Sequence, residues 1–497
     1  MKTSNSHSNV IDGKKLPSQS SRYFVSANPA NPNIELGVFP CSVSEDIDLA
    51  VQSAARAFES WRLVPAPKRA EIMMRAGLIL EKKKEFLAKL MTQEMGKVLK
   101  EARGDVQEAI DTAFYYSGEG RRLFGDTTPS ELRNKMALSL RMPVGVCGLI
   151  TPWNFPVAIP SWKIFPAIIC GNTVILKPAE DTPLCAEKFV EILHEAGLPP
   201  GVVNLIHGDG VTGDLIVKHP GIQLISFTGS SQVGKVVAEH CGKTLKRCSL
   251  ELGGKNAQLV MADADLELAL EGALWGAFGT TGQRCTATSR VLVEKPIFEK
   301  FRKELVRRAK QIRMGNGLDP STQMGPLINE AQRERVHEYV KQGVIDGAKL
   351  ECGGKIPSKG ILKKGFFYEP TIFSEVNPKM KIVKEEIFGP VTCLMSVKSF
   401  EEGIRMINDT RYGLSAALYT RDVNRAMRAI RDIESGITYI NSPTIGAEVH
   451  LPFGGVKNTG NGHREAGQAA LDIFSEWKSV YIDFSGRLQK AQIDVDE

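Results

Sequence analysis

Two side chains with catalytic potential lie 34 residues apart, each beside glycines. Cys285 ends the segment GQRC (282–285), and Glu251 lies within LELGGK (250–255). A cysteine nucleophile needs a base, which a carboxylate can supply, and the adjacent Arg284 is expected to lower the pKa of the thiol. Taken separately, the cysteine fits a buried structural thiol and the glutamate a solvated or paired carboxylate. Their occurrence together favours thiol chemistry.

Polar side chains also follow two predicted strands. The segments TPWNFP (151–156) and KPAE (177–180) each come at the end of an apolar run. Ligands of parallel α/β sheets bind at the carboxyl ends of strands. The Asn154 amide could therefore donate a hydrogen bond to a developing oxyanion, or bond its own turn backbone. Lys177 and Glu180 could hold the ribose hydroxyls of a cofactor, or form a surface ion pair.

Two glycine-rich segments could bind a phosphate. Residues 208–213 fit G-x-G-x-x-G, but the next strand ends without the carboxylate that accompanies this pattern. This segment is either a tight turn or a contact of an adenine. In FTGSSQVG (227–234), Gly229 permits a tight turn and Ser230 can cap a helix that begins at the next residue. Such a helix start favours a phosphate, although the same residues also fit an ordinary capped helix.

The elements that must position these residues alternate along the chain. Residues 44–120 have apolar residues at helical spacing, including a predicted helix over 68–90. Residues 145–251 alternate short apolar runs with helices, which predicts a parallel sheet, and residues 252–455 repeat this pattern. A strand-like segment follows within 466–497. We therefore predict an α/β fold with two α/β domains and a smaller arm.

The composition is that of an ordinary globular chain, with 42% hydrophobic and 24% charged residues. A net charge of +6 over 497 residues is too diffuse to indicate nucleic acid binding. Lys163 and two prolines interrupt the most apolar stretch (158–176), so no membrane partner is expected. The nine scattered cysteines include no CxxC pair, which disfavours a metal site and favours reduced thiols in the cytoplasm. The polar N-terminus is expected to be a flexible tail rather than a secretory signal.

Seven segments together resemble the aldehyde dehydrogenase superfamily, in order and at its spacing, from about residue 25 to 485. They are TPWNFP (151–156), KPAE (177–180), FTGSSQVG (227–234), LELGGK (250–255), GQRC (282–285), KEEIFGP (384–390) and PFGGVK (452–457). The resemblance implies a variant Rossmann cofactor domain, an α/β catalytic domain and a β-strand oligomerisation arm. The implied division is a flexible tail (1–22), an NAD-binding domain (23–121 and 142–252), a catalytic domain (253–455), and an oligomerisation arm with a C-terminal tail (122–141 and 456–497).

The resemblance also implies roles for single residues. Cys285 would be the nucleophile, Glu251 the base that activates water, and Asn154 an oxyanion donor. Glu180 would accept a hydrogen bond from a ribose hydroxyl and repel a 2′-phosphate, which favours NAD, while Lys177 leaves NADP possible. Cofactor contacts are implied for Trp153, Lys177, Glu180, Gly210, Gly229, Ser230, Gly234, Leu252, Glu386 and Phe388.

The substrate indicated is an aldehyde that also bears a carboxylate. Arg284 is similar to an arginine of relatives that act on such semialdehydes, and it would bind the carboxylate or, alternatively, tune Cys285 or form a structural ion pair. Phe155 and Trp162 would complete the substrate site. Residues 441–448 and 458–465 resemble 2-oxoglutarate-semialdehyde dehydrogenases.

Two further activities stay open from the sequence. One is a broad-specificity aliphatic aldehyde dehydrogenase, and the other is a dehydrogenase that acylates coenzyme A. Glu251 disfavours the second, because transfer to coenzyme A requires no base that activates water. We expect a homo-oligomer, either a dimer or a tetramer, assembled through the arm.

Overall fold

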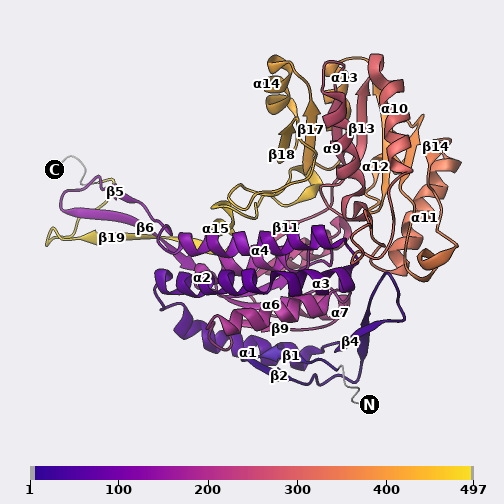
Figure 1. Cartoon of the computed structure of the whole chain (residues 1–497). Coiled ribbons are helices and arrows are strands. Elements are labelled where there is room, and N and C mark those ends of the chain that lie inside the picture. The colour runs from indigo at the N-terminus through magenta and orange to yellow at the C-terminus, as the bar shows by residue number, and fades with distance from the viewer. Residues whose placement is uncertain (1–5, 494–497) are drawn as a thin grey trace.

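The computed structural model describes residues 6–493, whose strands form two seven-stranded sheets, a three-stranded sheet and a two-stranded hairpin. Figure 1 shows the two large sheets in separate lobes, with the three-stranded sheet projecting to one side. The hairpin consists of β3 (Tyr23–Ala27) and β4 (Glu35–Pro40).

The first sheet has the strand order β11-β10-β7-β8-β9-β1-β2, and the strands from β11 to β9 run parallel. These parallel strands are short buried runs because helices cover both faces. The strands are β1 (Asn9–Ile11), β2 (Lys14–Leu16), β7 (Val146–Ile150), β8 (Thr173–Lys177), β9 (Val203–Leu205), β10 (Leu224–Thr228) and β11 (Arg247–Glu251). The helices are α1 (Ser44–Trp61), α2 (Ala66–Lys82), α3 (Lys84–Met95), α4 (Leu99–Glu119), α5 (Ala158–Ile169), α6 (Pro183–Glu195), α7 (Gly210–Lys218) and α8 (Ser231–Thr244).

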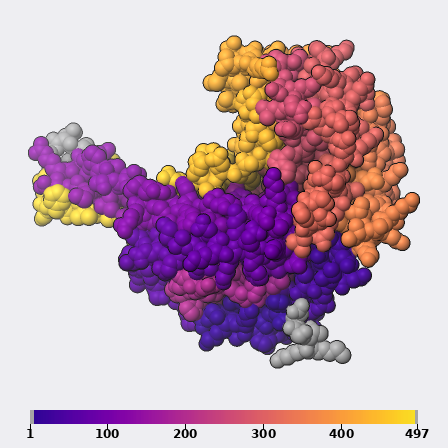
Figure 2. Space-filling view, in the orientation of Figure 1, coloured from indigo at the N-terminus to yellow at the C-terminus, as the bar shows by residue number. Residues whose placement is uncertain are grey.

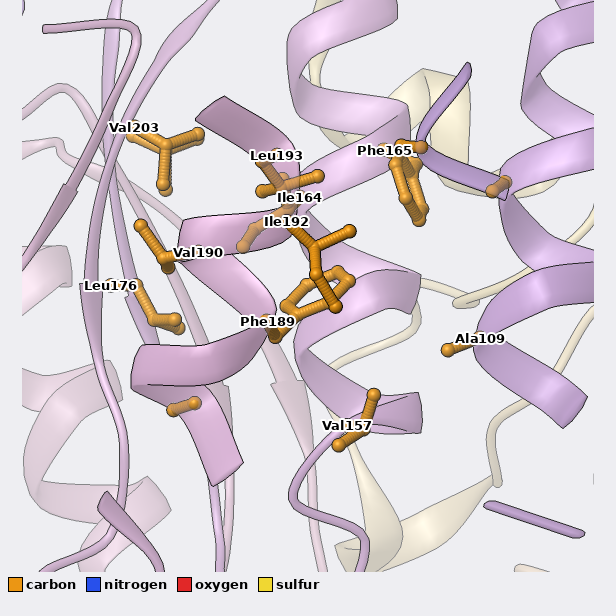
Figure 3. Packing of buried hydrophobic residues seen from close by; sticks show 14 of the residues in the cluster. Ala109, Val157, Ile164, Phe165, Leu176, Phe189, Val190, Ile192, Leu193 and Val203 are labelled. Atoms are coloured by element: carbon orange, nitrogen blue, oxygen red, sulfur yellow. The ribbon is translucent and has the colours of Figure 1, made fainter. Parts of the chain in front are cut away.

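Alternate side chains of the central strands enter two different cores. Leu176 of β8 packs among residues of α2 to α6, whereas the adjacent Ile175 packs among residues of α1, α7 and α8. In the first core, shown in Figure 3, Phe165 and Phe189 meet edge to face with their ring centroids 5.9 Å apart. Because both faces are filled, the carboxyl edge of the sheet is the part left for a ligand.

The predicted flexible tail over residues 1–22 is wrong for the part that the structure describes. β1 pairs antiparallel with β9 through Val10 and Leu205, and β2 pairs with β1. The buried Asn9 side chain donates a hydrogen bond to Ser42 Oγ over 2.8 Å. The segment can be polar because only Val10 and Ile11 of β1 are buried in the two cores, and these two apolar residues are too few to mark a strand in the sequence. Residues 1–5 lie outside the described residues.

The second sheet has the order β14-β15-β16-β13-β12-β17-β18, and only its β14–β15 pair is antiparallel. The strands are β12 (Asn256–Val260), β13 (Thr288–Glu294), β14 (Lys349–Cys352), β15 (Thr371–Ser374), β16 (Val391–Val397), β17 (Ser415–Tyr419) and β18 (Ile437–Ile440). The accompanying helices are α9 (Leu266–Phe278), α10 (Lys295–Ala309), α11 (Glu330–Ile345), α12 (Lys381–Lys384), α13 (Phe400–Asn408) and α14 (Val423–Asp432). Short 3-10 turns cover η1 (Gly279–Gly282), η2 (Gly360–Lys364) and η3 (Lys457–Thr459).

The third sheet is a long antiparallel arm. It consists of β5 (Thr127–Pro129), β6 (Lys135–Pro143) and β19 (Ser475–Asp483), the last of which follows the short helix α15 (Ala469–Ile473). The arm extends away from both lobes in Figures 1 and 2, and it leaves Trp477, Tyr481 and Ile482 largely exposed. Over residues 6–493, no helix combines the length and apolarity that crossing a membrane requires.

Candidate active site

The predicted site residues of the first lobe meet at one edge of its sheet. Most of them lie at or just after the carboxyl end of a parallel strand, whereas Trp162 lies within α5. In sheet order these residues are Glu251 of β11, Gly229 and Ser230 after β10, Asn154 after β7, Lys177 of β8 and Gly210 after β9. The order of the strands in the sheet therefore brings together segments that are up to about a hundred residues apart in the chain.

The second lobe contributes residues at the amino ends of its strands. The linker 252–255 joins β11 directly to β12, so the carboxyl edge of the first sheet faces the amino edge of the second. Cys285 comes shortly before β13, and Glu386 and Phe388 come shortly before β16. This arrangement places the predicted nucleophile and base on opposite sides of the junction between the lobes.

A cavity of about 300 Å³ lies at this junction. Its lining includes six of the predicted site residues, namely Phe155, Trp162, Glu251, Leu252, Arg284 and Cys285. The structure adds further lining residues that the sequence did not single out, including Lys100, Glu101, Glu108, Trp275, Phe453 and Glu465. The lining residues of α4 and α9 lie where the sequence carries no recognisable motif. Phe453 and Glu465 lie within the segments 452–457 and 458–465, whose patterns indicated no individual role for these two residues.

Cys285 is held by a strained turn and by buried polar contacts. Thr280 and Thr281 in η1 both have positive φ angles, of 51° and 58°. Asn256 Nδ2 donates a hydrogen bond to the Cys285 carbonyl over 2.7 Å. A Cβ on Gly254 would lie 2.6 Å from that carbonyl oxygen, so this glycine permits the close approach. Left-handed conformations in threonine cost free energy, and such strain is common where a reactive group is positioned.

The expected effect of Arg284 on the thiol is wrong. Desolvation raises the pKa of Cys285 to about 12, and the nearby carboxylates of Glu386 and Glu251 contribute to this rise. The Arg284 side chain instead lies between the rings of Phe155 and Trp275, at 5.3 and 5.1 Å from their centroids. Although Arg284 is next to Cys285 in the sequence, its guanidinium is not among the groups that shift the pKa of the thiol.

Arg284 is fixed in the cavity wall by three kinds of contact. Besides the two rings, its Nε donates to Thr280 Oγ1 over 2.9 Å, and its Nη2 lies 3.8 Å from Glu101 Oε1. No other hydrogen bond of its guanidinium is formed with the residues between 6 and 493. The two Nη groups are therefore held in place and can donate to a ligand.

Asn154 is 2% exposed and its amide lies beside the Cys285 segment. Its Nδ2 donates a hydrogen bond to the Gln283 carbonyl over 3.1 Å, which uses one of the two N–H groups. Its backbone carbonyl accepts from Lys97 Nζ over 2.7 Å, and Lys97 also forms a buried ion pair with Asp105 at 2.9 Å. This network fixes the amide and leaves its second N–H able to donate.

Glu251 is 3% exposed, and neither carboxylate oxygen has a hydrogen-bond partner within the described part of the chain. Burial raises its pKa well above the usual range, and the charge of Glu465 raises it further. Glu465 itself is paired with Lys163 of α5, whose Nζ also donates to Ser226 Oγ over 2.7 Å. Lys163 and Glu465 were missed because the sequence does not reveal a contact over 302 positions.

The glycine segment after β10 has little room for side chains. A Cβ on Gly229 would lie 2.5 Å from the Phe227 ring, and one on Gly234 would lie 2.4 Å from Leu252. Ser230 caps α8 as predicted, since its side chain accepts a hydrogen bond from the N–H of Val233. The 14-residue helix thus begins with free N–H groups at the carboxyl edge of the sheet.

Lys177 and Glu180 form an ion pair of 3.7 Å, in which Lys177 is buried and Glu180 is 47% exposed. Gly210, in the competing glycine segment, begins α7, which Asp209 caps. No atom lies within 4 Å of a Cβ placed on Gly210, so packing does not demand glycine there. The two glycine segments therefore differ in how tightly the fold constrains them.

Glu386 reaches back to the linker between the lobes. Its Oε1 accepts a hydrogen bond from the Gly254 N–H over 3.1 Å, and burial raises the pKa of this carboxyl to about 7. Phe388 has a φ angle of 61°, and its ring meets that of Trp153 edge to face at 5.4 Å. Glu386 and Phe388 thus lie at the junction, shortly before β16 begins, and each contacts a residue that follows a strand of the first sheet.

Comparison with known proteins identifies the family. The sequence pattern described as the aldehyde dehydrogenase family matches residues 16–480. This chain belongs to that family. An alpha-ketoglutaric semialdehyde dehydrogenase of Bacillus subtilis (strain 168) is 40% identical over 479 residues, which cover 96% of this chain and 98% of that protein. Retinal dehydrogenase 2 of Mus musculus is 43% identical over 482 residues, which cover 95% and 91% of the two chains.

The structure of this aldehyde dehydrogenase is also similar to solved structures of its family. The crystal structure of betaine aldehyde dehydrogenase from Staphylococcus aureus in complex with NAD+ superposes with a TM-score of 0.95. That protein is 34% identical, and the match covers 98% of this chain and 96% of the other. The predicted family and the predicted α/β fold class are thereby confirmed.

Proposed function

We propose that this aldehyde dehydrogenase oxidises a carboxylate-bearing semialdehyde to the dicarboxylic acid with NAD, and that Cys285 is the nucleophile. The observation that carries the proposal is that Cys285, Glu251 and Arg284 line one cavity. The similarity to a semialdehyde dehydrogenase supports this substrate class. The similarity to an NAD+ complex supports the cofactor.

The residues at the sheet edge fit NAD. The start of α8 offers backbone N–H groups beside Gly229 and Gly234, where added side chains would collide with their neighbours. The Glu180 carboxylate suits a ribose hydroxyl and would repel a 2′-phosphate, although Lys177 beside it leaves NADP as a second cofactor. NAD, when bound, supplies the acceptor for the hydride of the substrate. The remaining contacts are assigned to Trp153, Gly210, Ser230, Leu252, Glu386 and Phe388.

Cys285 attacks first in this proposal. Its thiol is protonated at neutral pH because its pKa is raised, so a base must take the proton as the sulfur attacks the aldehyde carbon. Glu251 lines the same cavity, and its raised pKa makes its carboxylate a competent proton acceptor. The Asn154 amide and the Cys285 backbone N–H donate to the oxygen that becomes negative.

Glu251 acts again once oxidation has left a thioester on Cys285 and the Glu251 carboxyl group has released the thiol proton to solvent. Its carboxylate takes a proton from a water molecule while the water oxygen attacks the thioester carbon. The carbon–sulfur bond then breaks, the acid leaves, and the Cys285 sulfur takes a proton from Glu251, which restores the thiol and the carboxylate. The lack of protein partners on both Glu251 oxygens, among residues 6–493, is consistent with a carboxylate that must exchange protons.

Arg284 is assigned to the second carboxylate of the substrate. Its guanidinium is held by two aromatic rings and by Thr280, and its Nη groups can form two parallel hydrogen bonds with a carboxylate. Phe155 and Trp162 would enclose the apolar carbons between the two ends of the substrate. This assignment favours a semialdehyde over a neutral aliphatic aldehyde.

We further propose a cytoplasmic homo-oligomer, either a dimer or a tetramer. The projecting arm exposes apolar residues of β19 that a second copy would cover, as the predicted oligomerisation role requires. The cytoplasmic assignment is supported by nine cysteines that are all free. Size-exclusion chromatography with light scattering, applied to the whole chain and to Tyr481→Asp, tests the role of the arm.

Steady-state NADH formation tests the activity itself. The panel contains 2-oxoglutarate semialdehyde, succinate semialdehyde, betaine aldehyde and neutral aliphatic aldehydes, each with NAD and with NADP. We expect the highest kcat/KM with the anionic semialdehydes and NAD, and no turnover by Cys285→Ala. Equal turnover of neutral aldehydes would contradict the substrate class. An acyl-CoA product in the presence of coenzyme A would contradict hydrolysis as the final step.

A further inference from the structure

Two cysteines outside the candidate active site lie thiol to thiol. Cys241 belongs to α8 and Cys248 to β11, and the two side chains pack in the same buried cluster, where their thiols are hydrogen-bond partners. Asn461 approaches Cys248 as well, donating from Nδ2 to its sulfur over 3.5 Å and to its carbonyl over 2.8 Å. Cys241 is fully buried, whereas Cys248 is partly exposed. One sulfur of the pair is therefore accessible and the other lies behind it.

We propose that Cys241 and Cys248 are a redox pair that a peroxide converts into an intramolecular disulfide. The Cys248 sulfur attacks one peroxide oxygen, the oxygen–oxygen bond breaks, and a water molecule leaves with a sulfenic acid formed on Cys248. The Cys241 sulfur then attacks the Cys248 sulfur, the sulfur–oxygen bond breaks, and a second water molecule leaves. Each thiol gives up one proton and one electron, and the peroxide takes up both of each.

The local chemistry distinguishes Cys248 from the other thiols. The hydrogen bonds donated by Cys241 and Asn461 lower the pKa of Cys248 to about 7, so a large fraction is thiolate near neutral pH. Burial raises the pKa of Cys393 to about 11 and that of Cys285 to about 12. Reactive redox cysteines combine a low pKa and exposure with a second cysteine that resolves the sulfenic acid. Cys248 and Cys241 meet these conditions together.

The position of the pair links it to the active-site edge. α8 starts at the glycine segment 227–234, and β11 ends at Glu251, three residues after Cys248. A disulfide would tie the last turn of that helix to the start of that strand. The two elements that frame the proposed cofactor site would then be joined covalently.

Peptide mapping of the full-length chain tests this proposal without depending on activity. The Cys285→Ala variant is used, so that the proposed nucleophile cannot react, and it is treated with hydrogen peroxide and digested with trypsin without reduction. Lys243, Lys246 and Arg247 lie between the two cysteines, so trypsin separates peptide 236–243 from peptide 248–255. We expect the two peptides to be joined, with a mass two hydrogens below their sum, and to separate after reduction.

Single variants define the order of the two steps. In Cys241→Ser the sulfenic acid on Cys248 should persist and react with dimedone, whereas Cys248→Ser should give neither the adduct nor the joined peptides. Cys352→Ser, which removes a buried thiol elsewhere, should leave the joined peptides unchanged. Irreversible oxidation of Cys248 without the linked peptides would overturn the proposal, as would linkage of Cys248 to another cysteine.

Discussion

Glu101 Oε1 accepts a hydrogen bond from the backbone N–H of Thr280 over 2.7 Å. Glu101 belongs to α4 of the first lobe, and Thr280 belongs to the left-handed turn that precedes Cys285 in the second lobe. The same carboxylate oxygen lies 3.8 Å from Arg284 Nη2. One buried carboxylate thus holds both the turn before the nucleophile and the proposed substrate-binding arginine.

Two replacements of Glu101 should distinguish its hydrogen bond to the Thr280 N–H from its charge beside Arg284. In Glu101→Ala, the buried Thr280 N–H loses its acceptor, which costs about 1–3 kcal/mol, and we expect a lower Tm and a lower kcat. Glu101→Gln keeps an oxygen acceptor, so its Tm should stay close to that of the unmodified chain. Thermal unfolding and steady-state kinetics measure both effects. Equal losses in the two variants would show that the hydrogen bond to Thr280 does not position the turn.

The two glycine segments allow a matched test of the cofactor site. Gly234→Ala puts a methyl group 2.4 Å from Leu252, a residue assigned to the cofactor, so the loop or Leu252 must shift. We expect the Kd for NAD to rise about tenfold, equivalent to 1.4 kcal/mol. Gly210→Ala is the control, because no atom lies within 4 Å of the added carbon. Fluorescence titration with NAD measures both, and a larger effect of Gly210→Ala would assign the phosphate to the other segment.

The sequence predicted the residues at strand ends well, because each is marked locally. Ser230 caps α8 as expected, and Glu251 and Lys177 end their strands, since short apolar runs and capping residues act over a few positions. The predicted helix 68–90 is instead two helices, interrupted at Lys83, where φ and ψ are −97° and 7°. No glycine or proline marks this break, so the periodicity of apolar residues could not reveal it.

Contacts between distant segments were not predictable in the same way. Glu465 lies beside Glu251 and Lys163 only because the C-terminal segment returns to the sheet edge after the second lobe is complete. The Arg284 guanidinium packs against Phe155 and Trp275, which belong to other elements. The direction of a side chain in a strained turn depends on packing, which adjacency in sequence does not specify.

Removing the proposed carboxylate ligand should change substrate preference. In Arg284→Leu, we expect KM for 2-oxoglutarate semialdehyde to rise about 10- to 100-fold, which corresponds to losing charge-assisted hydrogen bonds worth ~1.5–3 kcal/mol. A neutral aldehyde of similar length should be affected little. Arg284→Lys keeps the charge but loses the planar pair of donors, so its KM should lie between the two. A parallel loss for both aldehydes would assign Arg284 a structural role only.

The rate of the final hydrolysis should rise with pH and should depend on Glu465. Glu251 acts as a base only when deprotonated, and burial together with the Glu465 charge raises its pKa. Steady-state kcat of a hydrolysis-limited substrate should therefore increase as pH rises through that pKa. Glu465→Gln removes the neighbouring negative charge and leaves Lys163 to favour the Glu251 carboxylate. The pH range over which kcat increases should therefore move to lower pH.

The burst of NADH formation distinguishes the pH dependence of hydrolysis from that of the attack by Cys285. Pre-steady-state NADH formation reports the attack by Cys285, whose own raised pKa gives it a separate pH dependence, whereas steady-state kcat reports hydrolysis. Glu251→Gln should still release one equivalent of NADH per site, but more slowly because the thiol loses its proton acceptor, and its subsequent turnover should fall by about a hundredfold or more. Glu476→Gln, on the exposed strand β19, is the control and should leave the pH dependence of steady-state kcat unchanged. If the pH dependence of kcat is the same in Glu465→Gln as in the unmodified chain, Glu465 does not control the protonation of Glu251.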